Sequence, residues 1–427
     1  MYAGFSRVDI TPPVASQTDM YVPILGWANE RGKLVDAVRD PLYAKGLALS
    51  DGQRRAVLVV CDSLGDHVGY SMPARRLIEE RTGLQPDEII ILATHAHATP
   101  ETCDIGDRPV DPRWVAEMSE RIARCAVQAV ENSQPSRLRL IRREVPGLNA
   151  NRRRPDRPCD REMFVLLAED PTGRPLGALV AFAAHPTTVQ VHPFYSADYV
   201  GHAMGVIESA MGGDFVSVFA NGCCGDIRPE APENESGLVQ QGQVVGEAGL
   251  ELIHAIADGE GEPIDSTLRT AARNATVHRQ PLPPLTALLA ERERIVEALG
   301  GDLSIPDRWP DGLRSDLWYL DEKIALARGP ASWSVPIRGM AAGVMRLVAL
   351  PCEPLARVGA YIQSKASGPK PLVVGYADPM LGYVGMQADY DEGGYESIPA
   401  RWARLGPGSG EAITAVALEV LEELNRG

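Results

Sequence analysis

The sequence predicts an α/β fold, in which mixed β-sheets are flanked by helices within a single large domain. Two short apolar runs rich in β-branched residues, 54–62 and 88–94, are typical of buried strands. Apolar residues at helical spacing over 71–81 and 112–131 place a helix after each run, and this alternation is the pattern of an α/β core. The length agrees, because 427 residues can fold around one continuous system of sheets.

The same two periodicities predict the remaining elements. Further strands are expected at 138–145, 162–167, 178–184, 215–220, 332–338 and 343–350, and further helices at 199–211, 240–257, 284–299 and 411–425. Segments 259–265 and 300–314 are rich in glycine, proline and acidic residues, so we expect surface loops there. They make residues from about 259 to 330 a possible inserted segment of a domain that spans 1–427.

Composition and charge exclude several classes of partner. The chain has 42 basic and 57 acidic residues, and its formal charge of -15 would repel nucleic acid and anionic membrane surfaces. The first residues lack the basic start and apolar run of a secretion signal, and no stretch is long enough to span a bilayer. We therefore expect a cytoplasmic protein that acts on a small molecule, without nucleic acid or stable membrane association.

The seven cysteines favour a reducing compartment. Their number is odd, and they lack the regular spacing of a disulfide scaffold. The adjacent pair Cys223 and Cys224 invites interpretation as a nucleophile, but no basic neighbour is evident in the sequence. Small buried cysteines are the commoner case, and we favour that interpretation.

Three histidines come directly after predicted strands. His95 and His97 follow the run 88–94, and His185 follows the run 178–184. The carboxyl ends of strands are where α/β enzymes place their sites, and residues two apart in an extended segment point to the same side. Such histidines suit a catalytic zinc site, which keeps one position open for water. The alternative is that each is a polar loop residue with a satisfied hydrogen bond.

A carboxylate and a group of tyrosines complete the candidate set. Glu353 follows the predicted strand 343–350 and lies between two prolines. The glycine-rich segment 375–396 contains four of the twelve tyrosines, and a phenol beside a divalent cation can bind it or donate to an oxyanion. The alternatives are a solvated glutamate and tyrosines that pack against the sheet.

The segment 221–229 follows another predicted strand. Its two glycines allow a sharp turn whose backbone amides could face a bound anion. Asp226 within it could take up protons or orient a ligand.

Together these segments resemble the catalytic domain of the neutral/alkaline ceramidases, a family of zinc amidases. The resemblance covers nearly the whole chain, and the shared order of its motifs is more specific than any one motif. These are GFSRVDITP at 4–12, DPLYAK at 40–45, THAH at 94–97, NANR at 149–152, AHPT at 184–187, NGCCGDIRP at 221–229, PCEP at 351–354 and the segment 382–396. Because the chain ends at Gly427, we expect it to lack the C-terminal immunoglobulin-like domain of that family.

The resemblance also implies roles for individual residues. The ligands of a zinc ion, or of another divalent metal, would be His95, His185, Glu353 and Tyr383. The residues that contact the substrate amide or the reacting oxygen would be His97, Arg152 and Tyr395. Apart from the resemblance, the position of Asp226 in the segment 221–229 makes it a further catalytic candidate. By this analogy, metal-activated water attacks the carbonyl carbon and neighbouring donors stabilise the oxyanion.

One departure from the family pattern concerns the substrate. The family element Gly-Asp-Val-Ser-Pro carries a serine where this sequence has Arg228. A guanidinium can pair with both oxygens of a carboxylate or phosphate, which ceramide does not have. We therefore predict a small polar or anionic substrate contacted by Arg228, Asn221 and Tyr376. The alternative is that Arg228 forms a structural ion pair with a nearby acid.

Three hypotheses about function follow. The first is a zinc-dependent hydrolase that cleaves an amide bond. The second is a lyase or isomerase that uses the same metal as a Lewis acid on a polar metabolite. The third is a non-catalytic binding protein of the same fold.

Overall fold

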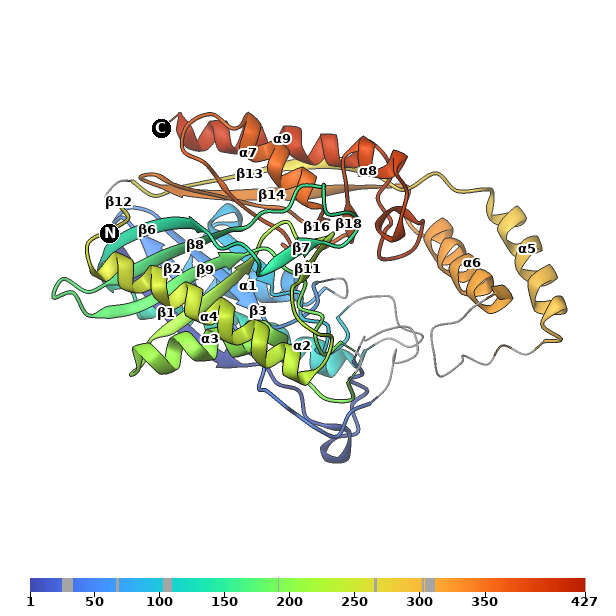
Figure 1. The fold of residues 1–427 in the computed structure, drawn as a ribbon, viewed down its shortest axis with the longest axis horizontal. Coiled ribbons are helices and arrows are strands. Elements are labelled where there is room, and N and C mark those ends of the chain that lie inside the picture. Colours follow the sequence, from blue (N-terminus) through green and yellow to red (C-terminus); the bar gives the residue numbers. More distant parts are fainter. Residues whose placement is uncertain are drawn as a thin grey trace.

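Three β-sheets surround a shared apolar core, and helices cover the outer face of each sheet (Figure 1). The computed structural model describes residues 1–24, 34–66, 69–102, 110–190, 192–264, 267–301, 303 and 312–426. All three sheets send apolar side chains such as Leu47, Leu166 and Leu347 into the core between them. The predicted mixed α/β class is confirmed.

The first sheet has the strand order β4-β3-β2-β1-β5. Only β3 and β4 run parallel among its pairs. Helices α1 and α2 bury an apolar stripe against its outer face through residues such as Ile78 and Ile122. The elements are β1 (Tyr2–Asp9), β2 (Tyr43–Ser50), β3 (Arg55–Cys61), β4 (Ile89–Ala93), β5 (Gln134–Pro135), α1 (Ser71–Thr82) and α2 (Pro112–Glu131).

The second sheet has the order β10-β9-β8-β6-β12, and its parallel pair is β9 with β10. Helices α3 and α4 pack against its outer face through residues such as Ile207 and Ile253. The elements are β6 (Arg137–Glu144), β8 (Glu162–Glu169), β9 (Pro175–Phe182), β10 (Val216–Asn221), β12 (Glu262–Ile264), α3 (Asp198–Met211) and α4 (Glu235–Ala257).

The third sheet has the order β13-β14-β15-β17, and its parallel pair is β15 with β17. Helices α7 and α9 cover it, with Ile362 and Val420 buried between the layers. The elements are β13 (Arg269–His278), β14 (Ser332–Ala342), β15 (Met345–Ala349), β17 (Leu372–Val374), α7 (Ala356–Lys365) and α9 (Ser409–Asn425).

Two short ribbons join the sheets near the ends of these parallel strands. The antiparallel ribbon pairs β7 (Asn149–Asn151) with β11 (Ile227–Pro229). The parallel ribbon pairs β16 (Glu353–Pro354) with β18 (Tyr383–Val384), and the short helix α8 (Gln387–Asp391) follows it. Both ribbons contain residues of the predicted site.

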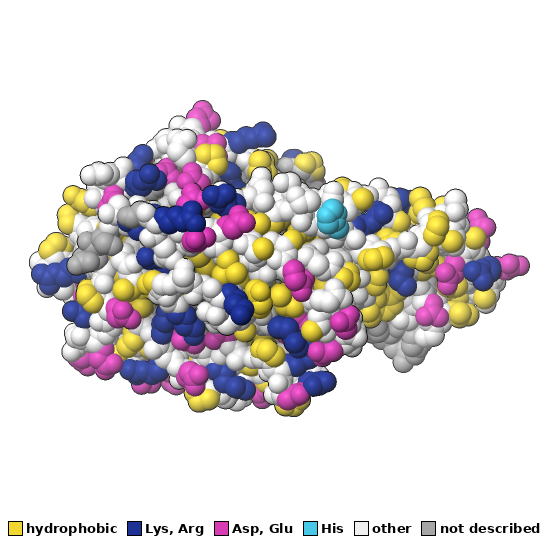
Figure 2. Space-filling model, turned by 90° about the horizontal axis from the view of Figure 1, so that it is seen from above, with side chains coloured by type: hydrophobic (Ala, Val, Ile, Leu, Met, Phe, Trp, Pro, Cys, Tyr) yellow, Lys and Arg dark blue, Asp and Glu magenta, His cyan; other side chains and the backbone are white. Residues whose placement is uncertain are grey.

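Helices α5 (Leu285–Ala298) and α6 (Gly312–Arg328) project from one end of the body (Figures 1 and 2). They pack on each other through Leu288, Leu320 and Ile324, which form an apolar cluster separate from the main core. The expected inserted segment from about 259 to 330 is therefore too long, because β12 and β13 within it pair in the sheets. The predicted loop at 300–314 lies largely outside the described residues.

One face of the surface shows how the charged side chains are distributed. On the face shown in Figure 2, basic and acidic side chains are interspersed rather than gathered into a basic patch. None of the helices in the described part of the chain combines the length and the apolar character needed to cross a bilayer.

Candidate metal centre

The ends of three strands bring His95, His185 and Glu353 together. His95 lies two residues after β4, His185 lies three residues after β9, and Glu353 begins β16 shortly after β15. The two histidine Nε2 atoms are 3.2 Å apart. Glu353 Oε2 is 3.1 Å from His95 Nε2 and 3.3 Å from His185 Nε2. All three side chains are buried.

The hydrogen bonds of the two imidazoles fix which nitrogen carries the proton. His95 Nδ1 donates to the carbonyl oxygen of Leu64 at 2.6 Å, and His185 Nδ1 donates to that of Cys224 at 2.7 Å. In a neutral imidazole, Nε2 then carries a lone pair. Burial lowers the pKa of His185 to about 4, so this ring is neutral at pH 7. The His185 Nε2 atom therefore presents a lone pair, and the His95 Nε2 atom, which the same hydrogen-bond pattern leaves without the proton in a neutral ring, faces the same point.

A cation between these acceptor atoms would offset their mutual repulsion. Glu353 Oε2 is a buried oxygen without a hydrogen-bond donor among the described residues, and it faces the same point as the two nitrogens. Zinc bonds of about 2.0–2.1 Å place neighbouring ligand atoms of a tetrahedral site roughly 3.3–3.4 Å apart, close to the spacings found here. The donor set therefore fits a zinc-type ion.

Tyr383 and His97 lie at the edge of this donor set. The Tyr383 hydroxyl is 3.5 Å from His185 Nε2, and it accepts a hydrogen bond from Arg152 Nη2 at 2.9 Å. Burial raises the pKa of Tyr383, and the guanidinium of Arg152 opposes that rise. His97 Nε2 is 3.4 Å from His95 Nε2, and His95, His97 and His185 could also hold an ion together. Burial lowers the pKa of His97 well below its ordinary value.

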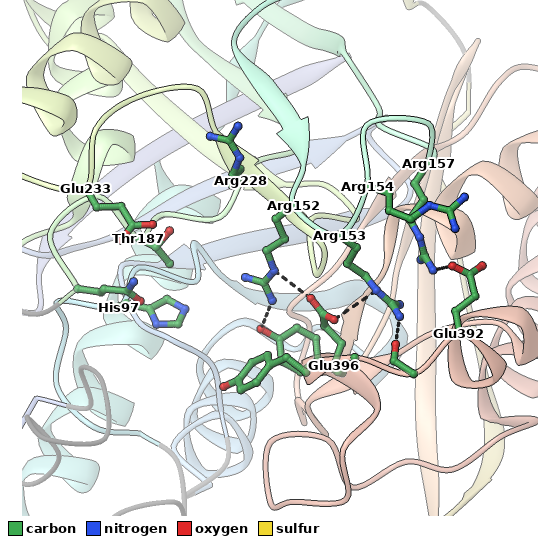
Figure 3. A pocket seen from close by; sticks show the side chains of 15 residues that line it. His97, Arg152, Arg153, Arg154, Arg157, Thr187, Arg228, Glu233, Glu392 and Glu396 are labelled. Atoms are coloured by element: carbon green, nitrogen blue, oxygen red, sulfur yellow. Dashed lines mark hydrogen bonds and ion pairs between the residues drawn. The ribbon is translucent and has the colours of Figure 1, made fainter. Parts of the chain in front are cut away.

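A cavity of about 800 Å³ opens above the donor set. Among the described residues that line it, five are arginines and three are glutamates (Figure 3). Glu396 lies between two of the arginines, 2.9 Å from Arg152 Nε and 3.5 Å from Arg153 Nε. The described lining residues are His97, Arg152, Arg153, Arg154, Arg157, Thr187, Gln190, Arg228, Glu233, Tyr383, Glu392, Gly393, Gly394, Tyr395 and Glu396.

The structure places eight of the predicted site residues at the donor set or on the cavity wall. His95, His185, Glu353 and Tyr383 are the four predicted ligands, and His97, Arg152 and Tyr395 line the cavity together with the predicted substrate contact Arg228. Sequence reasoning missed Glu396 and the arginines after Arg152. The run of four arginines within residues 152–157 was the available signal.

Three predicted residues lie away from the described cavity lining, and their roles stay predictions. Asn221 is buried and donates to the carbonyl oxygens of Thr94 and Ala184. Tyr376 is buried behind His95, and its ring stacks on that imidazole with centroids 4.2 Å apart. Neither is among the described residues that line the cavity, and both lie beside residues of the donor set or the strand ends that carry it.

Asp226 is the third predicted residue that lies away from the cavity lining. It is buried, it is not among the described lining residues, and both carboxylate oxygens accept hydrogen bonds within the protein. Oδ1 accepts from the Ala356 amide at 2.8 Å, and Oδ2 accepts from Asn151 Nδ2 at 2.7 Å. These bonds join α7 to the β7–β11 ribbon, so the geometry gives Asp226 structural contacts, and the predicted catalytic role stays a prediction.

Fold and site together define an α/β protein with a buried nitrogen and oxygen donor set beneath a cavity lined largely by arginine and glutamate side chains. Its structure is similar to the crystal structure of neutral ceramidase from Pseudomonas aeruginosa, with a TM-score of 0.77 and 20% sequence identity over 99% of this chain and 74% of that one. It is also similar to a structure described as ceramidase complexed with C2, with a TM-score of 0.76 and 19% identity over 99% and 75% of the two chains.

The chain therefore has the fold of neutral ceramidase, as the resemblance in sequence predicted. No family model matches the sequence.

Proposed function

We propose that this protein is a zinc-dependent amidohydrolase that cleaves the C–N bond of a small polar substrate. The observation that supports this most is the convergence of two imidazole Nε2 atoms and one carboxylate oxygen that lacks a described hydrogen-bond donor at the floor of a cavity. The ceramidase fold supports it independently, because the solved structures similar to this chain are described as ceramidases.

The residues around the donor set can each take a part in hydrolysis. His95, His185, Glu353 and Tyr383 would hold the ion, which when bound supplies Lewis-acid activation of water and carbonyl. His97 reaches the donor set from the cavity side, and its neutral imidazole is able to accept a proton from the attacking water.

Arg152 lies where negative charge would develop on the substrate. Its guanidinium is anchored by Glu396 and reaches the Tyr383 hydroxyl at the edge of the donor set. Preorganised donors of this kind stabilise an oxyanion, because they need no reorganisation as the charge forms. Tyr395 lines the same cavity, with its ring centroid 5.8 Å from that of Tyr383.

The lining of the cavity favours a polar substrate over ceramide. A long acyl chain is bound by contact with apolar surface, at about 25 cal/mol per Å² that is removed from water. The described lining residues are mainly charged or hydrogen-bonding, and among them only the two tyrosines offer large apolar faces. A compact substrate with several polar groups fits this wall better.

Metal content and product chemistry test the proposal. Elemental analysis of protein produced with added zinc should find one equivalent per chain. The variant His95→Ala should lose that metal and the activity, while the control His254→Ala, an exposed histidine on α4, should keep both. A screen of acylated amino acids, acylated amino sugars and short lipid amides in ¹⁸O-labelled water should place the label in the acid product.

Two outcomes would contradict the proposal. Absence of metal from zinc-supplemented protein would favour a binding protein of the same fold. A product of unchanged formula, or an eliminated fragment without the label, would favour a lyase or isomerase.

A further inference from the structure

Arg228 and Arg152 project from the same face of the β7–β11 ribbon. Register pairs Arg228 with Ala150, and side chains of paired residues lie on one face of a ribbon. Arg152 is two residues beyond Ala150, so the period of two places it on that face as well. The burial of the ribbon residues supports this assignment, because Asn151 and Ile227 on the other face are buried while Arg228 is exposed. Both arginines line the cavity (Figure 3).

The ion pair of Arg228 is the kind that a ligand can replace. Its Nη2 is 3.0 Å from Glu230 Oε1, and the two side chains are 50% and 37% exposed. Exposed pairs of this kind contribute little net stability. The neighbouring guanidinium groups are held more firmly: Arg152 and Arg153 by the buried Glu396, and Arg157 by the buried Asp389.

We propose that Arg228 binds an anionic group of the substrate, a carboxylate or phosphate, so that the preferred substrates are acidic amides. This inference rests on the proposed hydrolysis at the metal centre. The scissile carbonyl meets Arg152 and Tyr383 at the cavity floor, and the anionic group leaves Glu230 and pairs with Arg228 further out on the same ribbon face. A guanidinium suits either anion, because its fork of donors matches two oxygens at once.

The side of the cavity near His97 also restricts where the anion can lie. Glu233 and Thr187 line the cavity on the side of His97 (Figure 3). A carboxylate of the substrate would be repelled by Glu233, whereas Arg228 on β11 offers a guanidinium whose ion pair is exposed. The anionic group is therefore directed toward β11.

The test compares three substrates that share the same acyl group: an N-acyl amino acid, its uncharged carboxamide, and N-acylated phosphoethanolamine. In Arg228→Ser, kcat/KM for the carboxylate should fall about 10- to 100-fold through KM, because a charge-assisted pair is lost, while the carboxamide changes little. Arg228→Lys should retain part of the preference. Glu230→Gln should lower KM for the anionic substrates by removing the competing carboxylate. The preferred anion is identified by which acidic substrate responds more.

Arg154→Ser is the matched control. Arg154 also lines the cavity and carries an exposed ion pair, with Asp156, so its removal changes the local charge equally without touching the ribbon. An equal loss of preference in this variant, or an equal loss for charged and uncharged substrates in Arg228→Ser, would overturn the inference.

A binding measurement separates the proposed role of Arg228 from the proposed hydrolysis. Calorimetric titration with an N-acetylated amino acid measures the Arg228 contact without hydrolysis. Weaker binding to Arg228→Ser than to wild type and Arg154→Ser would support the inference even if no amide in the panel were cleaved. Equal binding to all three proteins would overturn it.

Discussion

At the scale of single residues, the candidate metal centre includes a ligand and a neighbouring tyrosine whose backbones have an uncommon conformation. His95 has a φ of 68° and Tyr376 a φ of 61°, in the left-handed region that residues other than glycine enter at a cost of roughly 1–2 kcal/mol. The two rings stack on each other. Backbone bonds hold both residues, since the His95 amide donates to Ser63 and the Ala93 amide donates to the Tyr376 carbonyl. Backbone strain is therefore concentrated at the two residues that set the orientation of the His95 imidazole.

Asp226 gives a prediction at this scale, because its structural role differs from a catalytic one in what it affects. In Asp226→Asn, one of its two partners, the Ala356 amide or the Asn151 side-chain amide, would face an NH₂ group instead of an oxygen. A buried donor left without an acceptor costs about 1–3 kcal/mol. We expect a lower midpoint of urea unfolding with unchanged metal content. A loss of kcat at an unchanged midpoint would instead make Asp226 catalytic.

At the scale of elements, the parallel ribbon β16–β18 sets two predicted ligands side by side. Its register pairs Glu353 with Tyr383. The Glu353 amide donates to the Gly382 carbonyl, and the Tyr383 amide donates to the Trp402 carbonyl, both at 2.8 Å. The spacing of the carboxylate and the phenol therefore depends on close approach of three backbone segments.

Gly382 makes that approach possible and provides a prediction. It has a φ of 82°, and a Cβ at this position would overlap the Trp402 carbonyl oxygen. Gly382→Ala should displace β18, so the protein should lose metal faster to a chelator and lose activity. The matched control is Gly147→Ala, where φ is 83° and nothing lies within 4 Å of the added Cβ. It carries the same backbone strain, roughly 1–2 kcal/mol, and should retain metal. Equal metal retention in both variants would contradict this role of Gly382.

The elements that could be predicted from sequence are those with a long run of one periodicity. The helix predicted at 112–131 is α2 with the same bounds, because its apolar stripe is regular and Asp111 caps it. The strand predicted at 88–94 is β4, since a run of four consecutive apolar residues begins it. Strands such as β13 were missed, because half of its residues face solvent and alanine and arginine dominate it.

The residues of the candidate site also differ in whether the sequence could predict their positions. Histidines at strand ends indicated the metal centre, because the sheet itself brings such ends together. The partners of Arg152 could not be predicted, since Glu396 and Tyr383 are more than 200 residues away and reach it only through the packing of α8 and the ribbons. The sequence predicted Asn221 and Tyr376 on the cavity wall because both lie in or near a motif of the site. Whether a side chain faces the cavity depends on how the chain packs, and both side chains are buried.

At the scale of the whole molecule, a buried charged cluster joins two of the three sheets behind the metal centre. Arg75 on α1 donates to both carboxylate oxygens of Asp378 at 2.8 Å, and Arg338 on β14 approaches the same carboxylate at 3.3 Å. Asp378 lies in the segment that also positions Tyr376 against His95. The contact between the first and third sheets is therefore continuous with the support of a predicted ligand.

Removing the charge of Asp378 should accordingly weaken both the fold and the metal centre. Asp378→Asn leaves two buried guanidinium groups close together without a counter-charge, which costs about 3–5 kcal/mol. We expect a lower midpoint of urea unfolding and faster release of zinc to a chelator. Asp156→Asn, which removes the partner of the exposed Arg154, should leave both close to wild type. If Asp378→Asn lowered the midpoint but released zinc at the wild-type rate, the sheets would be coupled to each other and not to the metal centre.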